Sequence, residues 1–179
     1  MATAELLHKL RIEIGGNSQI DKTIWKAPSL AHGVAEGVVC ELLGNARTEW
    51  LIQLFRMHPD KRIFWCEKEQ RISPLAIRQR GVDLDRILFM DSSVDHQKIL
   101  HRTLESSTYP FIVSPQLSND VKTLQRLHLL CGKGKSTLFF LPDKQFSQAW
   151  PVSLQLDVNF LDDEFKVEVV RQKYGGGEP

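Results

Sequence analysis

The sequence predicts an α/β fold with a mostly parallel β-sheet, helices on both faces of that sheet, and a C-terminal antiparallel β-hairpin. Between about residues 37 and 141, short apolar runs typical of buried strands alternate with segments of helical length. Such alternation is typical of crossover helices that cover both faces of a parallel sheet. Beyond residue 151, two segments alternate apolar with polar residues, which indicates paired strands with one buried face.

Two segments precede this alternation. Residues 1–16 are predicted to form an amphipathic helix, because apolar residues that include Leu6 and Leu10 recur at helical spacing and a glycine pair ends the pattern. Residues 17–36 show no regular period, and the sequence predicts an irregular polar segment there.

The alternation itself defines the predicted strands and helices of the core. The strands are expected at residues 37–43, 62–66, 86–90, 110–113 and 136–141. The helices are expected at residues 46–57, 73–80 and 94–105, and from Ser118 or Asn119 to Cys131.

The hairpin and the tail complete the chain. The last two predicted strands cover residues 152–160 and 165–172, and the acidic residues between them form the turn. A glycine-rich tail at residues 175–179 is expected to be flexible. A chain of 179 residues has room for a single domain, and its core is expected at residues 34–174.

Composition narrows the classes of function. A formal net charge of +1 gives no overall field that would attract DNA or a membrane, so any contact with DNA is expected to be weak or indirect. The three cysteines lie far apart without zinc-binding spacing, and we expect buried free thiols. The lack of zinc-binding spacing also predicts that no metal is bound. The sequence shows no signal peptide and no membrane-spanning run, which predicts a soluble cytoplasmic protein that does not bind a membrane.

The turn after the first core strand is where a parallel sheet of this type commonly binds phosphate. A phosphate loop has the pattern G-x-x-x-x-G-K-[ST], in which backbone N–H groups, a lysine and a hydroxyl hold phosphates and magnesium. Here the turn retains only Gly44, followed by Arg47 and Thr48. The run GKGKST at residues 132–137 leads from a helix into a strand, which is the reverse order, and is predicted to be a polar turn. The sequence therefore predicts no nucleotide cofactor and no catalytic residues.

Several segments resemble the RecA recombinase family. Residues 74–88 resemble the helix, turn and strand that follow the catalytic glutamate of that family, and in this register Glu69 takes the place of the glutamate. Residues 38–44 resemble the strand that enters the RecA phosphate loop, residues 136–141 a core strand, and residues 152–173 the terminal hairpin. The resemblance covers the whole predicted core and implies a RecA-like fold.

The departures from the RecA family imply a changed function. The loop after Gly44 lacks the lysine and the hydroxyl, and Ser114 or Pro115 stands where the family has an aspartate near magnesium. Without phosphate or metal, Glu69 has nothing to act on and is expected to be a relic.

Two bacterial families with RecA-like cores lack this nucleotide machinery, the ImuA and SulA families. The basic last strand and the glycine-rich end of this chain resemble the ImuA family, accessory proteins of damage-induced (SOS) mutagenesis. That resemblance implies a non-catalytic role in translesion DNA synthesis in the bacterial cytoplasm. The implied partners are an ImuB-like homologue of Y-family polymerases and an error-prone DnaE-type polymerase, with RecA as a further candidate.

Three other functions stay open. A SulA-like protein would inhibit cell division by binding the GTPase FtsZ through the same kind of fold. An active RecA-like DNA-dependent ATPase would need a phosphate site assembled from Arg47, Thr48 and Lys135. An unrelated α/β binding protein, or an enzyme with a dispersed site, would bind its ligand at the strand ends.

Candidate partner-binding residues lie at the two ends of the chain. Leu6 and Leu10 are candidates either for self-association or for packing on the chain's own core. Arg171, Lys173 and Tyr174 precede the glycine run and form either a basic docking element or a solvated terminus.

Overall fold

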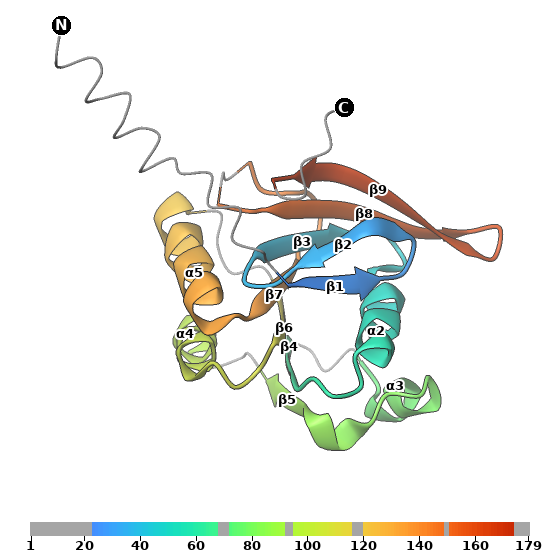
Figure 1. Cartoon of the computed structure of the whole chain (residues 1–179), viewed down its shortest axis with the longest axis horizontal. Helices are drawn as coiled ribbons and strands as arrows, with labels where there is room; N and C mark the ends of the chain where they lie inside the picture. The colour runs from blue at the N-terminus through green and yellow to red at the C-terminus, as the bar shows by residue number, and fades with distance from the viewer. Residues whose placement is uncertain (1–22, 68–71, 92–94, 116–119, 149–150, 174–179) are drawn as a thin grey trace, which may run out of the picture.

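The computed structural model describes residues 23–67, 72–91, 95–115, 120–148 and 151–173. The predicted N-terminal helix and the glycine-rich tail lie outside these ranges. A seven-stranded sheet forms the middle layer of the described chain, and helices cover both of its faces (Figure 1). The predicted α/β class is therefore confirmed.

The strands of the large sheet lie in the spatial order β5-β4-β6-β7-β3-β8-β9. Their bounds are β3 Val39–Leu43, β4 Ile63–Glu67, β5 Ile87–Asp91, β6 Phe111–Pro115, β7 Thr137–Leu141, β8 Leu154–Leu161 and β9 Glu164–Gln172. Neighbours from β5 to β8 pair in parallel, and β9 at the edge pairs antiparallel with β8. The mostly parallel sheet and the terminal hairpin are confirmed, with strand ends within one or two residues of the predicted ones.

The described helices divide between the two faces of the sheet. They are α2 Arg47–Met57, α3 Pro74–Gln79, α4 His96–Ser106 and α5 Val121–Gly134, with a 3₁₀ turn at Leu84–Arg86 before β5. Helices α2 and α3 bury their apolar side chains in one core cluster, and α4 and α5 bury theirs in a second cluster across the sheet (Figure 1). The prediction of helices on both faces is confirmed.

The prediction of irregular structure at residues 17–36 is wrong for the described part of that segment. Strands β1 (Ile24–Ala27) and β2 (Leu30–Ala35) form an antiparallel hairpin there. Both strands are short and interrupted by polar residues, so no period of two is visible in the sequence.

Two tryptophans attach this hairpin to the α2 face of the large sheet. The indole N–H of Trp25 in β1 donates to the hydroxyl of Thr137 in β7 at 3.2 Å. The indole N–H of Trp50 in α2 donates to the carbonyl of Pro28, between β1 and β2, at 2.7 Å. Because Trp25 is only 7% exposed, the core begins earlier in the chain than the predicted residue 34.

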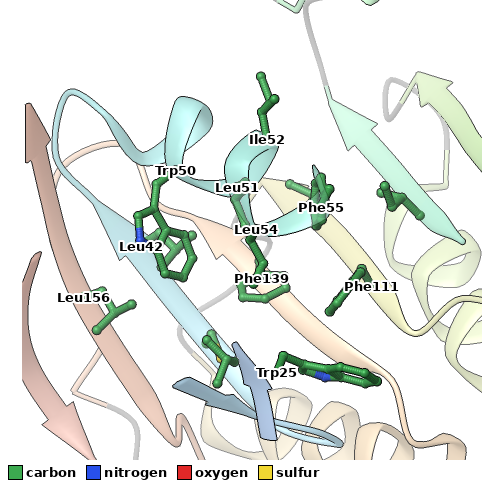
Figure 2. Close-up of a cluster of buried hydrophobic side chains, with 14 of the residues drawn as sticks. Trp25, Leu42, Trp50, Leu51, Ile52, Leu54, Phe55, Phe111, Phe139 and Leu156 are labelled. Carbon is green, nitrogen blue, oxygen red and sulfur yellow. The ribbon is translucent and has the colours of Figure 1, made fainter. Parts of the chain in front are cut away.

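Aromatic rings join the hairpin, α2 and the sheet in one cluster. The ring centroid of Phe111 in β6 lies 5.2 Å from that of Trp25, 5.4 Å from that of Phe55 and 6.3 Å from that of Phe139. Figure 2 shows these side chains grouped on the side of the sheet that α2 covers. Edge-to-face and tilted contacts of this kind add to the stability that burial provides.

Helix α5 begins later than predicted. Asp120 is its N-cap, and the Asp120 carboxylate accepts from the amide of Thr123 at 2.9 Å. The predicted caps, Ser118 and Asn119, lie outside the described residues.

The same helix also ends later than predicted, at Gly134, so the polar turn predicted at residues 132–137 is wrong for its first half. A Cβ on Gly134 would lie 2.9 Å from the carbonyl oxygen of Leu104, so this glycine lets α5 approach α4 closely. Lys135, with a φ of +53°, then ends the helix before β7.

The turn between β8 and β9 is tighter than predicted. Asp162 and Asp163 both have positive φ, at +53° and +62°, and Leu161 pairs with Glu164. A two-residue turn with both central residues in the left-handed region matches the twist of antiparallel strands.

Candidate functional site at the carboxyl edge of the sheet

Strands β3 to β8 run in parallel, so their carboxyl ends meet at one edge of the sheet. Open α/β sheets commonly bind their ligands at this edge. The turn between β3 and α2 carries the predicted residues Gly44, Arg47 and Thr48 to it. A ligand could bind there only through polar groups and backbone that are not already bonded within the protein.

Gly44 is packed against β8. Its φ is +94°, and a Cβ at this position would lie 2.0 Å from the carbonyl oxygen of Val158 and 2.6 Å from Oδ1 of Asp157. In a phosphate loop, glycine lets the backbone approach the phosphate. Here it lets the turn approach a neighbouring strand, which fills that space.

Two backbone N–H groups of the turn are bonded to the same strand. The amide of Asn45 donates to Oδ1 of Asn159 at 3.2 Å, and the amide of Ala46 donates to the carbonyl of Val158 at 3.1 Å. The amide of Phe160 donates in return to Oδ1 of Asn45 at 3.1 Å. Asn45 and Ala46 therefore offer no free backbone N–H group to a phosphate at this turn.

The side chains at the start of α2 also form contacts within the protein. Nη1 of Arg47 donates to the carbonyl of Pro142, just beyond β7, and Glu49 forms an ion pair with Arg80. Thr48 is partly exposed. Lys135 precedes β7 and so lies toward the opposite edge of the sheet. The structure keeps Gly44, Arg47 and Thr48 together but does not bring Lys135 to them.

Glu67 ends β4 at the same edge, next to a cavity of about 280 Å³ that Asp91 and Pro74 also line. One carboxylate oxygen of Glu67 accepts from the amide of Ile72 at 3.2 Å. Glu69, the predicted relic, lies between Glu67 and Ile72 in the sequence and is outside the described part of the chain.

Ser114, at the position of the family's aspartate, is fully buried at the end of β6. Its hydroxyl donates to the carbonyl of Pro115 at 2.8 Å and lies 2.9 Å from Nε2 of His96 at the start of α4. Because the Ser114 hydroxyl donates its proton to the carbonyl of Pro115, the imidazole N–H of His96 is the donor in the bond to Ser114. Burial lowers the pKa of His96, which favours the neutral ring. The pair thus connects α4 to the sheet.

The sequence-based prediction missed Glu41, a β3 side chain with 0% exposure. Its Oε2 accepts from the amide of Ser147 at 2.9 Å and from the side-chain amide of Gln155 at 2.7 Å. The same Gln155 amide donates to the carbonyl of Ser147 at 2.7 Å. A buried carboxylate requires such donors. The available signal was a single acidic residue within the apolar run GVVCELL.

The predicted partner-binding residues are only partly described. Arg171 lies near the end of β9, and the backbone of Lys173 continues the hairpin by donating to the carbonyl of Ser153 at 3.0 Å. Partial burial and the charge of Arg171 lower the pKa of Lys173. Leu6, Leu10 and Tyr174 lie outside the described residues.

The cysteines are buried free thiols, as predicted. Burial raises the pKa of Cys40 and of Cys131, so both favour the neutral form. Within the described ranges, no group of three or more His, Cys, Asp or Glu side chains could hold a metal ion. No helix in these ranges is long and apolar enough to cross a bilayer.

Comparison of the chain with protein-family models and with curated proteins found no match.

Proposed function

We propose that this chain is a non-catalytic accessory protein of SOS mutagenesis and translesion DNA synthesis, built on a RecA-like core. It acts through contacts with an ImuB-like polymerase homologue and an error-prone DnaE-type polymerase, with RecA as a further candidate. The observation that carries the non-catalytic part is the turn after β3, where the amides of Asn45 and Ala46 donate to β8 and Gly44 packs on that strand.

Binding of a nucleotide at this turn would oppose several contacts at once. A phosphate needs free N–H groups and a nearby cation. Freeing the amides of Asn45 and Ala46 would break two hydrogen bonds to β8, each contributing about 1 kcal/mol. The guanidinium of Arg47 would also have to leave the carbonyl of Pro142.

The positions of the resembling segments support a RecA-like core. The strand that resembles the one entering the phosphate loop is β3, which lies inside the sheet between β7 and β8. The segment at residues 74–88 forms α3, the 3₁₀ turn and the start of β5, in the order that the resemblance implies. The terminal hairpin β8–β9 extends the same sheet.

Isothermal titration of the purified chain with ATP and magnesium tests the non-catalytic part of the proposal. We expect no heat of binding at millimolar ATP, with RecA titrated in parallel as the positive control. Binding at micromolar ATP would contradict the proposal and favour an active RecA-like ATPase.

Pull-down with purified candidate partners tests the accessory role. We expect the tagged chain to capture an ImuB-like protein or a DnaE-type polymerase and to leave FtsZ unbound. Capture of FtsZ alone would overturn the proposal in favour of a SulA-like inhibitor. Capture of none of these proteins would also count against it.

A further inference from the structure

An open groove of about 690 Å³ lies between α4 and α5, on the face of the sheet opposite α2. Figure 1 shows the two helices beside each other on that face. Four cationic side chains line the groove: Lys98 and Arg102 from α4, and Lys122 and Arg126 from α5. All four are exposed, and none forms an ion pair with another described residue.

The spacing of these cations places them in two facing rows. Residues four apart on a helix lie on one side of it, with about 6 Å between their Cβ atoms. Lys98 and Arg102 have this spacing on α4, and Lys122 and Arg126 have it on α5. The groove therefore has a positive row on each wall.

The groove concentrates charge that the chain as a whole does not have. The formal net charge of all 179 residues is only +1. Against the four cations, the acidic side chains that line the groove are Asp95 and Glu105, and Glu105 lies 3.4 Å from Nδ1 of His101. Positive groups held near each other in a concave surface, where they outnumber the carboxylates, attract an anionic partner.

The lining favours an acidic peptide over a nucleic acid. Single-stranded nucleic acids are usually held by aromatic side chains on which bases stack. Among the described residues, no Trp, Tyr or Phe lines this groove. Asp95 and Glu105 would also oppose a continuous phosphate backbone, whereas a peptide with separated carboxylates can avoid them.

We propose that the α4–α5 groove binds an acidic, extended peptide segment of a partner protein. In an extended peptide, alternate side chains on one face lie about 7 Å apart, close to the spacing of the cations on each helix. Arg102 and Arg126 would bind carboxylates through two N–H groups each, and Lys98 and Lys122 through single ammonium contacts. This inference rests on the proposed function in one respect, because it names the docking surface of an interaction protein.

Fluorescence anisotropy with purified full-length chain tests the inference. The probe is a short fluorescein-labelled peptide with aspartate at every second position, and the control peptide carries asparagine instead. We expect the aspartate peptide to bind, with an affinity that falls as salt rises, and the asparagine peptide not to bind. Tighter binding of a labelled oligothymidylate than of the aspartate peptide would overturn the choice of partner.

Charge reversal locates the site. The double variant Arg102→Glu and Arg126→Glu should weaken binding of the aspartate peptide about tenfold or more, because attraction is replaced by repulsion on both walls. The matched control is Arg78→Glu with Lys166→Glu, two exposed residues on α3 and β9 that should leave binding unchanged. Equal losses in both double variants, or no loss in the first, would overturn the groove as the site.

The experiments distinguish failure of the groove inference from failure of the proposed function. A chain that captures an ImuB-like protein but does not bind the aspartate peptide would overturn the groove inference alone. A chain that binds the peptide in the groove but captures none of the repair proteins would overturn the proposed function and support the groove as an acidic-peptide site.

Discussion

The core on the α2 face of the sheet includes large aromatic side chains, whereas the core on the α4–α5 face is largely aliphatic. Buried polar side chains also lie on the α4–α5 face. Trp25, Phe55 and Phe111 represent the first face. Glu41 and Gln155 alternate along β3 and β8 with residues of the aromatic cluster, so they face the α4–α5 side.

The two faces therefore differ in what they contribute: packing on the α2 face stabilises the fold, and the outer surface of the α4–α5 face carries charge available to a partner. The aromatic face is closed by α2 and the β1–β2 hairpin, and its polar groups at the edge, such as the amides of Asn45 and Ala46, are bonded within the protein. On the other face, Ser114 and His96 are hydrogen-bonded to each other inside, and cations outnumber carboxylates in the groove outside. The first face is therefore expected to respond most to loss of volume, and the second to changes of charge.

The largest effect is expected from Phe111→Ala on the aromatic face. It should lower the free energy of unfolding by about 4 kcal/mol, because Phe111 contacts β1, α2 and β7 at once. Leu104→Ala, buried on the α4–α5 face, should cost about 3 kcal/mol. Denaturant unfolding measures both, and a larger loss for Leu104→Ala would contradict the comparison.

Gly44→Ala is expected to lower the free energy of unfolding by about 3 kcal/mol, because it combines a φ of +94° with a Cβ placed 2.0 Å from the carbonyl oxygen of Val158. Gly81→Ala is the matched control: its φ is +82°, but the nearest atom to a Cβ is 3.6 Å away, so only backbone strain of about 1 kcal/mol applies. Thermal or denaturant unfolding should show the difference. Equal losses would mean that the packing of the turn on β8 contributes nothing.

Glu41→Leu tests the buried polar cluster on the other face. It removes the acceptor of two buried donors, the amide of Ser147 and the side chain of Gln155, and should cost about 2 kcal/mol. Glu41→Gln keeps one acceptor oxygen and should cost less than about 1 kcal/mol. If both variants unfold at the same denaturant concentration, the hydrogen bonds to Glu41 are not what stabilises this segment.

The smallest effect is expected from the titration of His96. Because burial lowers its pKa, the unfolded chain takes up this proton at a higher pH than the folded chain does. The contribution of His96 to stability is thus complete above the ordinary histidine pKa of about 6.5 and is lost as the pH falls toward the lower folded pKa.

The measurement compares wild type with His96→Gln between about pH 8 and about pH 5, since the other histidines titrate in both proteins. Wild type should lose more of its unfolding free energy on acidification than the variant does. A larger loss in His96→Gln would show that the sign is wrong.

Much of the fold was predictable because its signals are local. The apolar runs of β3 to β7 and the alternation in β8 and β9 are visible within a few residues, and the structure confirms them within one or two positions. The absence of a lysine after Gly44 is equally visible in the sequence. The β1–β2 hairpin and the last turn of α5 were not predicted, because contacts with distant residues such as Thr137 and Leu104 stabilise them.

The sequence by itself determined the class of the fold, the order of strands and helices from β3 onward, and the lack of a phosphate-loop motif. Only the tertiary structure decided where the amides after β3 are bonded, which donors surround Glu41, and that the cations of α4 and α5 share one groove. The physical reason is sequence separation. Asn45 meets Asn159 114 residues away and Glu41 meets Ser147 106 residues away, and such contacts exist only once the sheet has assembled.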